Sequence, residues 1–209
     1  IVGMDASGLE LRMLAHYMND QDYIREVITG DVHTANQRAA GLPTRDAAKT
    51  FIYAFLYGAG PAKIGAIVGG SKAKGAALKR SFLDNTPALA QLRDRVGKAA
   101  AKGYLVGLDG RRIEVRSRHA ALNTLLQGAG AVVMKQALVN LNRMVRAHKL
   151  DVAFVGNIHD EVQAEVRKSH AEKYGKLAVY SVIKAGQDLG LRCPLNAEYK
   201  VGNSWAETH

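Results

Sequence analysis

The sequence predicts an α+β fold, in which a small sheet carries a long helical insertion. Apolar segments compatible with β-strands lie near both ends of the chain, at 1–4, 152–166 and 191–201. Between them, most of the chain places apolar residues at helical spacing, interrupted by glycine and proline. Hydrophobic residues make up 47% and charged residues 23% of the 209 residues, which is an ordinary globular composition.

The first half of the chain is predicted to be mainly helical after one short strand. Residues 1–4 form the strand, and a helix follows over 9–19. Another helix over 45–57 begins after Thr44, which is a favourable N-cap residue. Further elements are predicted as helices within 62–102, a turn at 107–110 and a strand over 112–116.

The second half is predicted to return to the sheet. A long helix over 119–148 has one apolar face. The segment 152–166 alternates around a polar turn at 157–160, which predicts a hairpin. A helix over 168–189 and a closing strand within 191–201 complete the order of elements.

Composition and charge narrow the class of protein. The sequence contains no run of eighteen apolar residues, so no membrane-spanning helix is predicted. The single cysteine, Cys193, excludes an internal disulfide and a cysteine-based zinc site. The net charge of +10 suits a polyanionic partner such as nucleic acid, or a solvated basic surface. Because Ile1 leads straight into an apolar stretch, we expect the chain to be part of a longer polypeptide.

Two acidic positions indicate a possible metal site. Asp5 follows the first predicted strand, and Ala6 beside it is small enough for side-chain and backbone oxygens to face one ion. Asp160 and Glu161 lie in the turn of a hairpin predicted to be apolar and buried, where adjacent carboxylates repel unless a cation compensates. Asp5 is also compatible with a helix cap, and the pair with a solvated turn. If Asp5 and Asp160 converge, they form the two-metal arrangement of nucleotidyl transfer.

The helix over 45–57 carries a second candidate site. Arg45, Lys49, Tyr53 and Tyr57 recur every four residues, so they lie along one slowly drifting face. Cations near a helix N-terminus oppose the helix dipole, and a bound triphosphate would remove that conflict. The pattern is compatible with a nucleoside triphosphate site, and also with an amphipathic helix that places aromatic residues in the core.

A polar stripe lies at the start of the long helix over 119–148. His119, Asn123 and Gln127 are four residues apart in a segment rich in alanine and leucine. Such a stripe could reach base edges in a minor groove, or it could face solvent. Basic residues precede it, and they suit phosphates or a solvated surface: Arg111, Arg112, Arg116 and Arg118.

The order and spacing of these motifs resemble one family. The chain is similar to the family A (Pol I-like) DNA polymerases, including the replicases of short-tailed T-odd bacteriophages. Segment 5–12 resembles the family's motif A, and the helix 44–58 resembles motif B. The hairpin 152–167, with His159-Asp160-Glu161, resembles motif C. Segment 119–128 resembles the stretch that contacts primer-template near the insertion site.

The resemblance implies roles for individual residues. Asp5 and Asp160 would hold two Mg²⁺ ions, for which Mn²⁺ can substitute, and Ala6 would add its backbone carbonyl. Lys49 would protonate the leaving pyrophosphate, and Glu161 would support the primer terminus. The implied nucleotide-binding residues are Ala6, Ser7, Gly8, Glu10, His33, Arg45, Lys49, Tyr53 and Tyr57. The implied DNA-binding residues are Arg111, Arg112, Arg116, His119, Asn123, Gln127 and His159.

The resemblance also implies a right-hand polymerase organisation. Residues 1–14 and 111–209 would form the palm, a small antiparallel sheet with packed helices, and 15–110 the helical fingers. No segment resembles the thumb or the 3′–5′ exonuclease. The expected partners are primer-template DNA, dNTPs and an upstream polymerase portion that carries those two domains. The expected location is the cytoplasm of a bacterial host infected by a phage, with no membrane partner.

The expected function is therefore that of a template-directed DNA polymerase core. One alternative is a related single-chain RNA polymerase. By the resemblance, Glu10 would exclude a ribose 2′-hydroxyl. Glu10 and the pair Asp160 and Glu161 therefore argue against an RNA polymerase. Another alternative is a weakly active or non-catalytic DNA-binding subunit, although all the expected catalytic side chains are present.

Overall fold

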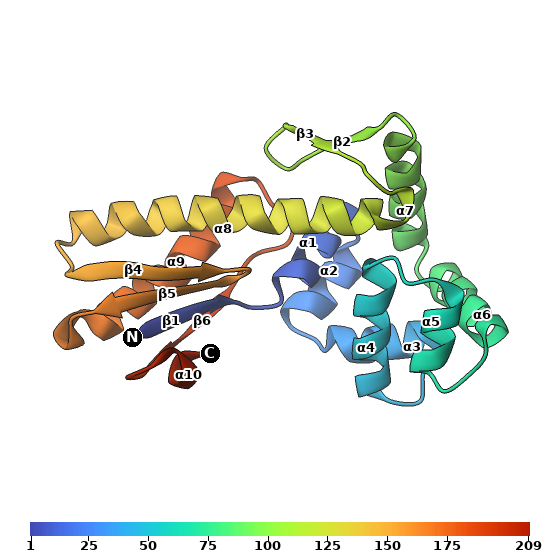
Figure 1. Cartoon of the computed structure of the whole chain (residues 1–209), viewed down its shortest axis with the longest axis horizontal. Coiled ribbons are helices and arrows are strands. Elements are labelled where there is room, and N and C mark those ends of the chain that lie inside the picture. Colours follow the sequence, from blue (N-terminus) through green and yellow to red (C-terminus); the bar gives the residue numbers. More distant parts are fainter. The chain divides into compact units, whose positions relative to one another are not determined.

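The computed structural model describes all 209 residues, Ile1–His209. The chain divides into two compact units, of which the first comprises 1–13 and 128–209 and the second comprises 14–127. The two boundaries fall inside α1 (Leu9–Met18) and α8 (Ala121–Ala147), which Figure 1 labels. Each of these helices therefore contributes residues to both units.

The first unit is built on a four-stranded antiparallel sheet (Figure 1). Its strands are β1 (Val2–Ala6), β4 (Val152–Ile158), β5 (Glu161–Val166) and β6 (Ala197–Val201). They lie in the order β4-β5-β1-β6, so β1 and β5 are central. Val2 pairs with Ala164, and Met4 pairs with Val162. All four of these side chains are buried, which explains why segments so far apart in the sequence hold together.

Helices cover the sheet of the first unit. The helix α9 (Ala171–Asp188) packs against β1 and β6. Gly175 permits this approach, because a Cβ atom there would overlap the ring of Tyr199 on β6. A 3₁₀ turn, η2 (Lys168–His170), precedes α9, and the short helix α10 (Trp205–Thr208) contacts β1 and β6. Cys193, between α9 and β6, is fully buried, and that burial raises the pKa of its thiol while Arg12 lowers it.

The second unit is mainly helical. Its complete helices are α2 (Gln21–Ile28), α3 (Val32–Ala40), α4 (Arg45–Leu56), α5 (Pro61–Ile67), α6 (Lys72–Asp84) and α7 (Pro87–Ala100). A hairpin of β2 (Tyr104–Val106) and β3 (Arg112–Glu114) follows, then a 3₁₀ turn, η1 (Arg118–Ala120). Phe51, Phe55 and Phe82 form its aromatic core, with ring centroids 5.1 to 5.9 Å apart. None of the helices in the structure is both long and apolar enough to cross a membrane.

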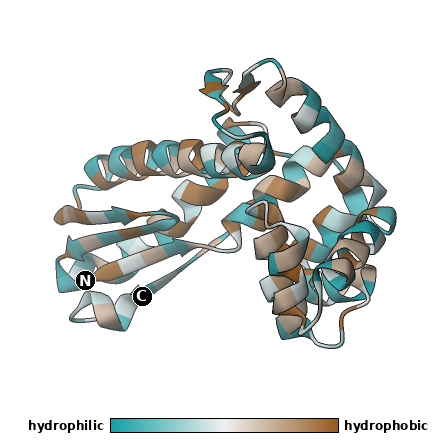
Figure 2. Ribbon diagram, turned by 45° about the vertical axis from the view of Figure 1, so that its right-hand side comes forward, coloured by the Kyte–Doolittle hydropathy of each residue, from teal (hydrophilic) through white to brown (hydrophobic).

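Hydrophobic residues recur along the whole of α8 (Figure 2). Figure 2 shows hydrophobic and hydrophilic residues interleaved along the whole of α8, rather than one apolar block. Buried residues recur along α8, including Leu126, Val133, Ala137 and Leu141. Their spacing along the helix is compatible with one buried face.

The structure confirms the predicted α+β class and corrects several details. The long helix expected over 119–148 begins at Ala121, because residues 118–120 form a 3₁₀ turn. The helices α2 and α3 are absent from the prediction, although Asp20 and Asp31 cap them through backbone N–H groups. The hairpin expected to be buried is exposed along β4, since β4 is an edge of the sheet. Phe154 and Val155 on that strand are 38% and 58% exposed.

Candidate active site

Acidic residues gather on one face of the sheet in the first unit. Asp5 on β1 lies opposite Glu161 on β5 and Glu198 on β6. Residues directly opposite each other in an antiparallel pair point to the same face, so these three side chains are neighbours. The N–H group of Ala6 donates to the carbonyl oxygen of Asp160 at 3.0 Å, which fixes the hairpin turn beside the end of β1. The structure therefore brings Asp5, Asp160 and Glu161 together.

The charges of these acids act on one another. Partial burial raises the pKa of Asp5, and the carboxylates of Asp160, Glu161 and Glu198 raise it further. His209 opposes this shift. The side chains of Asp5 and Asp160 accept no hydrogen bond from the protein. Adjacent carboxylates with free oxygen lone pairs are an environment that a divalent cation would stabilise.

Glu161 is held in a different way from Asp5. Its side chain is almost fully buried, and Trp205 Nε1 donates to Glu161 Oε1 at 2.7 Å. His209 Nδ1 lies 2.6 Å from Glu161 Oε2, and the amide of Gln163 also donates to Oε1. Burial alone would raise the pKa of Glu161, but the hydrogen bonds from Gln163, His209 and Trp205 hold it below its usual value. Because both oxygens are engaged, Glu161 suits a supporting position better than that of a main metal ligand.

The turn between β1 and α1 is also well defined. The Ser7 N–H group donates to the carbonyl of Asn196 at 3.0 Å, and the Ser7 carbonyl accepts from Arg12 Nε at 2.7 Å. Gly8 adopts φ +57°, in the left-handed region that favours glycine. Glu10, in the first turn of α1, is partly buried. His159 takes φ +53° in the hairpin turn and is exposed.

Some members of this site escape prediction from the sequence. Trp205 and His209 reach Glu161 only because the C-terminal segment folds back beside β5, and no local pattern joins them, whereas Gln163 lies two residues along the same strand. Glu198 belongs to the predicted closing strand, but only the observed pairing of that strand with β1 places it opposite Asp5. No group of three or more histidine, cysteine, aspartate or glutamate side chains in the structure forms a ready-made metal site.

The second unit brings together the residues predicted to bind a triphosphate. Arg45 Nε binds Asp31 Oδ2 at 2.6 Å. The rings of His33 and Tyr53 lie 6.2 Å apart, centroid to centroid. Burial lowers the pKa of His33, Arg45 and Lys49 lower it further, and Asp31 opposes them. Arg45, Lys49, His33 and Tyr53 therefore share one side of the α3–α4 pair, a basic surface next to an aromatic ring.

The electrostatic argument made for this helix from the sequence needs correction. Arg45 does lie in the first turn of α4, where the helix dipole disfavours a cation. The structure relieves that conflict without a ligand, because the Asp31 carboxylate pairs with Arg45 and Asp46 stands in the same turn. Asp31 itself caps α3 by accepting from the N–H groups of His33 and Thr34. The position of Arg45 is thus no independent sign of a triphosphate.

The candidate DNA-binding residues of the second unit are spread over three elements. His119 lies in η1 and is exposed, whereas Asn123 and Gln127 follow on α8. The Arg112 guanidinium stacks on the Tyr104 ring at 4.5 Å, across the β2–β3 hairpin. Two further arginines differ in their contacts: Arg111 binds Asp109 at 2.5 Å, and Arg116 is exposed. Tyr57, at the C-terminal cap of α4, is 52% exposed.

Comparison with known proteins defines the class of fold. The structure matches the polymerase domain of Pol1 from M. smegmatis, solved in complex with DNA primer-template and dNTP, with a TM-score of 0.87 at 24% identity. The match covers 99% of this chain and 40% of that one. The fold is therefore that of the polymerase domain of Pol I-like enzymes.

Sequence comparison places the chain within a family. The model of DNA polymerase family A matches residues 1–207. The DNA-directed DNA polymerases of Escherichia phage Phieco32 and Escherichia phage T7 are each 43% identical to it, and DNA polymerase I of Geobacillus stearothermophilus is 28% identical. These matches cover 98% to 100% of this chain but 40%, 33% and 26% of the three relatives. The chain belongs to DNA polymerase family A, and it spans less than half the length of these relatives.

Proposed function

We propose that this chain is the catalytic core of a template-directed DNA polymerase, which transfers a nucleotidyl group from a dNTP to a primer 3′-hydroxyl. The convergence of Asp5 and Asp160 at one end of the central strands is the observation that carries the proposal. In that reaction the primer 3′-oxygen attacks the α-phosphorus, and the bond to the leaving pyrophosphate breaks. A carboxylate on a strand and a carboxylate in the adjacent hairpin turn suit such chemistry, because they can share a pair of divalent ions.

The residues present fit a pair of Mg²⁺ ions, with Mn²⁺ as a substitute. Asp5 and Asp160 offer hard oxygen donors that repel each other in the absence of a cation. The Ala6 carbonyl would add a third oxygen, and water and substrate phosphates would complete the coordination. When bound, such ions neutralise phosphate charge and activate the attacking oxygen. Glu161, fixed by Trp205 and His209, would support the primer terminus.

The α3–α4 surface would bind the incoming nucleotide. Arg45, Lys49 and His33 would face its phosphates, and Lys49 would deliver a proton to the leaving pyrophosphate. Tyr53, beside His33, would contact the sugar. The turn 6–8 would border the nucleotide in the first unit, where Glu10 would exclude a 2′-hydroxyl.

We propose that residues 1–14 and 111–209 form a polymerase palm and that residues 15–110 form the fingers. The compact units divide the chain differently, because residues 111–127 belong to the second unit. The β2–β3 hairpin, the start of α8 and His159 would contact primer-template DNA. An upstream polymerase portion that carries the thumb and exonuclease would be the partner, and the setting would be a phage-infected bacterial cytoplasm. The M. smegmatis polymerase domain was solved in complex with DNA primer-template and dNTP, and this supports the same choice of ligands here.

Primer extension tests the proposal. The chain would be assayed alone and with the upstream portion supplied, using Asp160→Asn as the test variant and Glu172→Gln, on the exposed side of α9, as the control. Asp160→Asn should abolish extension, and Glu172→Gln should leave it unchanged. Preferential use of ribonucleotides would favour an RNA polymerase. DNA binding without extension in either assay would favour a non-catalytic subunit.

A further inference from the structure

Arg12, near the start of α1, is the only one of the 29 lysines and arginines that is buried. Its residue surface is 8% exposed. Burying a guanidinium is costly unless its N–H groups are paired. No acidic side chain pairs with Arg12, and backbone carbonyl groups accept its hydrogen bonds instead. If this position served packing alone, an apolar side chain would fill it at a lower cost.

The guanidinium joins two segments that are far apart in the sequence. Arg12 Nε donates to the carbonyl oxygen of Ser7 at 2.7 Å, and Arg12 Nη1 donates to the carbonyl oxygen of Pro194 at 2.5 Å. Side chains on a helix lean toward its N-terminus, which lets Arg12 reach back to the turn before α1. Ser7 belongs to that turn, whereas Pro194 belongs to the segment between α9 and β6. Arg12 therefore holds the turn and this segment together.

The same two segments fix the peptide bond between Ala6 and Ser7. The Ser7 N–H group donates to the carbonyl oxygen of Asn196 at 3.0 Å, two residues beyond Pro194. The carbonyl oxygen and the N–H group of a trans peptide point in opposite directions. A fixed Ser7 N–H group therefore also fixes the direction of the Ala6 carbonyl. This contact requires that Asn196 stay beside the turn, and Arg12 binds the chain on both sides of it.

We propose that Arg12 is a positioning residue for the metal site, because it holds the backbone that sets the direction of the Ala6 carbonyl. The inference rests on the proposed function, in which that carbonyl offers a third oxygen beside Asp5 and Asp160. Groups that orient metal ligands from outside the coordination sphere typically change metal affinity or activity by about 10-fold to 100-fold when they are removed. Arg12 would act in this way through Ser7 and Pro194, without contact with an ion or a substrate.

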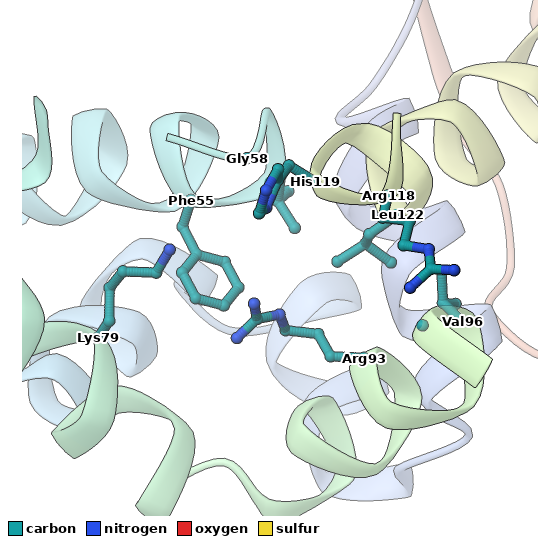
Figure 3. Close-up of a pocket in the computed structure, with 10 residues that line it drawn as sticks. Phe55, Gly58, Lys79, Arg93, Val96, Arg118, His119 and Leu122 are labelled. Atoms are coloured by element: carbon teal, nitrogen blue, oxygen red, sulfur yellow. The ribbon is translucent and has the colours of Figure 1, made fainter. Parts of the chain in front are cut away.

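Three variants separate positioning from charge and from general stability. Arg12→Met removes both donors and the charge. Arg12→Lys keeps the charge, but one ammonium nitrogen replaces the two separate nitrogens that bind Ser7 and Pro194. Arg93→Met is the matched control, because it makes the same chemical change in the second unit. Figure 3 shows Arg93 beside Phe55, and its Cζ atom lies 5.1 Å from the centroid of that ring.

The first measurement is Mn²⁺ binding to the full chain, followed by electron paramagnetic resonance without DNA or nucleotide. Asp160→Asn identifies the part of the signal that belongs to the site. Arg12→Met should weaken that binding about tenfold or more, and Arg12→Lys should weaken it less. Arg93→Met should bind Mn²⁺ as the wild type does.

The second measurement is primer extension as a function of Mg²⁺ concentration, with the upstream portion supplied. Arg12→Met should need more Mg²⁺ for half-maximal extension, and high Mg²⁺ should restore part of the lost rate. A variant that is merely less stable would lose rate equally at every Mg²⁺ concentration. Arg12→Lys should lie between Arg12→Met and the wild type.

Circular dichroism melting would establish that each variant is folded, and Arg12→Lys decides the matter if Arg12→Met is not. Mn²⁺ affinities of the folded Arg12 variants equal to that of the wild type would overturn this inference alone. So would an equal loss in Arg93→Met, or failure of both Arg12 variants to fold, which would assign Arg12 to stability. If the wild type shows no Mn²⁺ site that Asp160→Asn removes, the proposed function itself fails at its metal site.

Discussion

Asp31 has two roles in the second unit, and they can be separated. Its carboxylate caps α3 through the N–H groups of His33 and Thr34, and it also binds Arg45. Asparagine is as good an N-cap residue as aspartate, so Asp31→Asn should keep the helix. The same change removes the negative charge that faces Arg45.

Asp31→Asn should lower the pKa of His33 further. Asp31 is the group that raises the pKa of His33 against burial and against the charges of Arg45 and Lys49. The measurement is an NMR titration of the His33 ring protons in both proteins. Asp46→Asn, which removes an acid elsewhere in the first turn of α4, is the control and should leave the pKa of His33 nearly unchanged. An unchanged or higher pKa of His33 in Asp31→Asn would contradict the arrangement described for α3 and α4.

Tyr53 allows a second prediction about a single side chain. If its hydroxyl takes the place of a missing 3′-hydroxyl, a dideoxynucleotide leaves no polar group unpaired in the closed site. An unpaired group there would cost about 1–3 kcal/mol, and about 1.36 kcal/mol corresponds to tenfold in rate. Tyr53→Phe should therefore raise discrimination against dideoxynucleotides about tenfold or more, with little effect on normal synthesis.

A competition assay between dideoxy and deoxy substrates, in an assembled enzyme that contains this chain, measures that discrimination. Tyr180→Phe, on an exposed part of α9, is the control. Equal discrimination by wild type and Tyr53→Phe would mean that Tyr53 does not contact the sugar.

The junction between α4 and η1 depends on one glycine. Gly58→Ala would place a Cβ atom on the carbonyl of His119 and would force a non-glycine residue to φ +79°. We expect a loss of about 1–3 kcal/mol in the free energy of unfolding, measured by urea denaturation. Gly97→Ala is the matched control, because Gly97 is helical and its Cβ would meet open space. That change should stabilise the protein by about 0.4–1 kcal/mol, and a loss as large as that of Gly58→Ala would refute this explanation.

Local patterns predicted the elements well and their surroundings less well. The helix from Arg45 to Leu56 and the hairpin turn at Asp160 follow from capping and alternation, which are properties of neighbouring residues. The exposure of β4 could not be predicted in this way, because an apolar strand has the same sequence pattern at the edge of a sheet as at its centre. Trp205 lies 44 residues from its partner Glu161, and Asp31 lies 14 residues from its partner Arg45, so these contacts could be identified only in the tertiary structure.

The whole chain carries a net charge of +10, which should make DNA binding strongly dependent on salt. Each phosphate neutralised releases condensed counterions, so log K should fall by about 0.9 per phosphate for each tenfold rise in salt. The measurement is a titration of primer-template by fluorescence anisotropy at several salt concentrations. A flat dependence would mean that the basic residues do not meet a DNA backbone.

The burial of Cys193 has a practical consequence for labelling. A thiol reacts as its thiolate, and Cys193 is inaccessible with a raised pKa. Ellman's reagent should therefore react slowly with the native protein and quickly in urea, and fast reaction of the folded chain would show that the thiol is reachable. Because Cys193 is the single cysteine, a second one introduced at the exposed Lys98 would react alone. A fluorophore could then be attached at one chosen site without replacing the native cysteine.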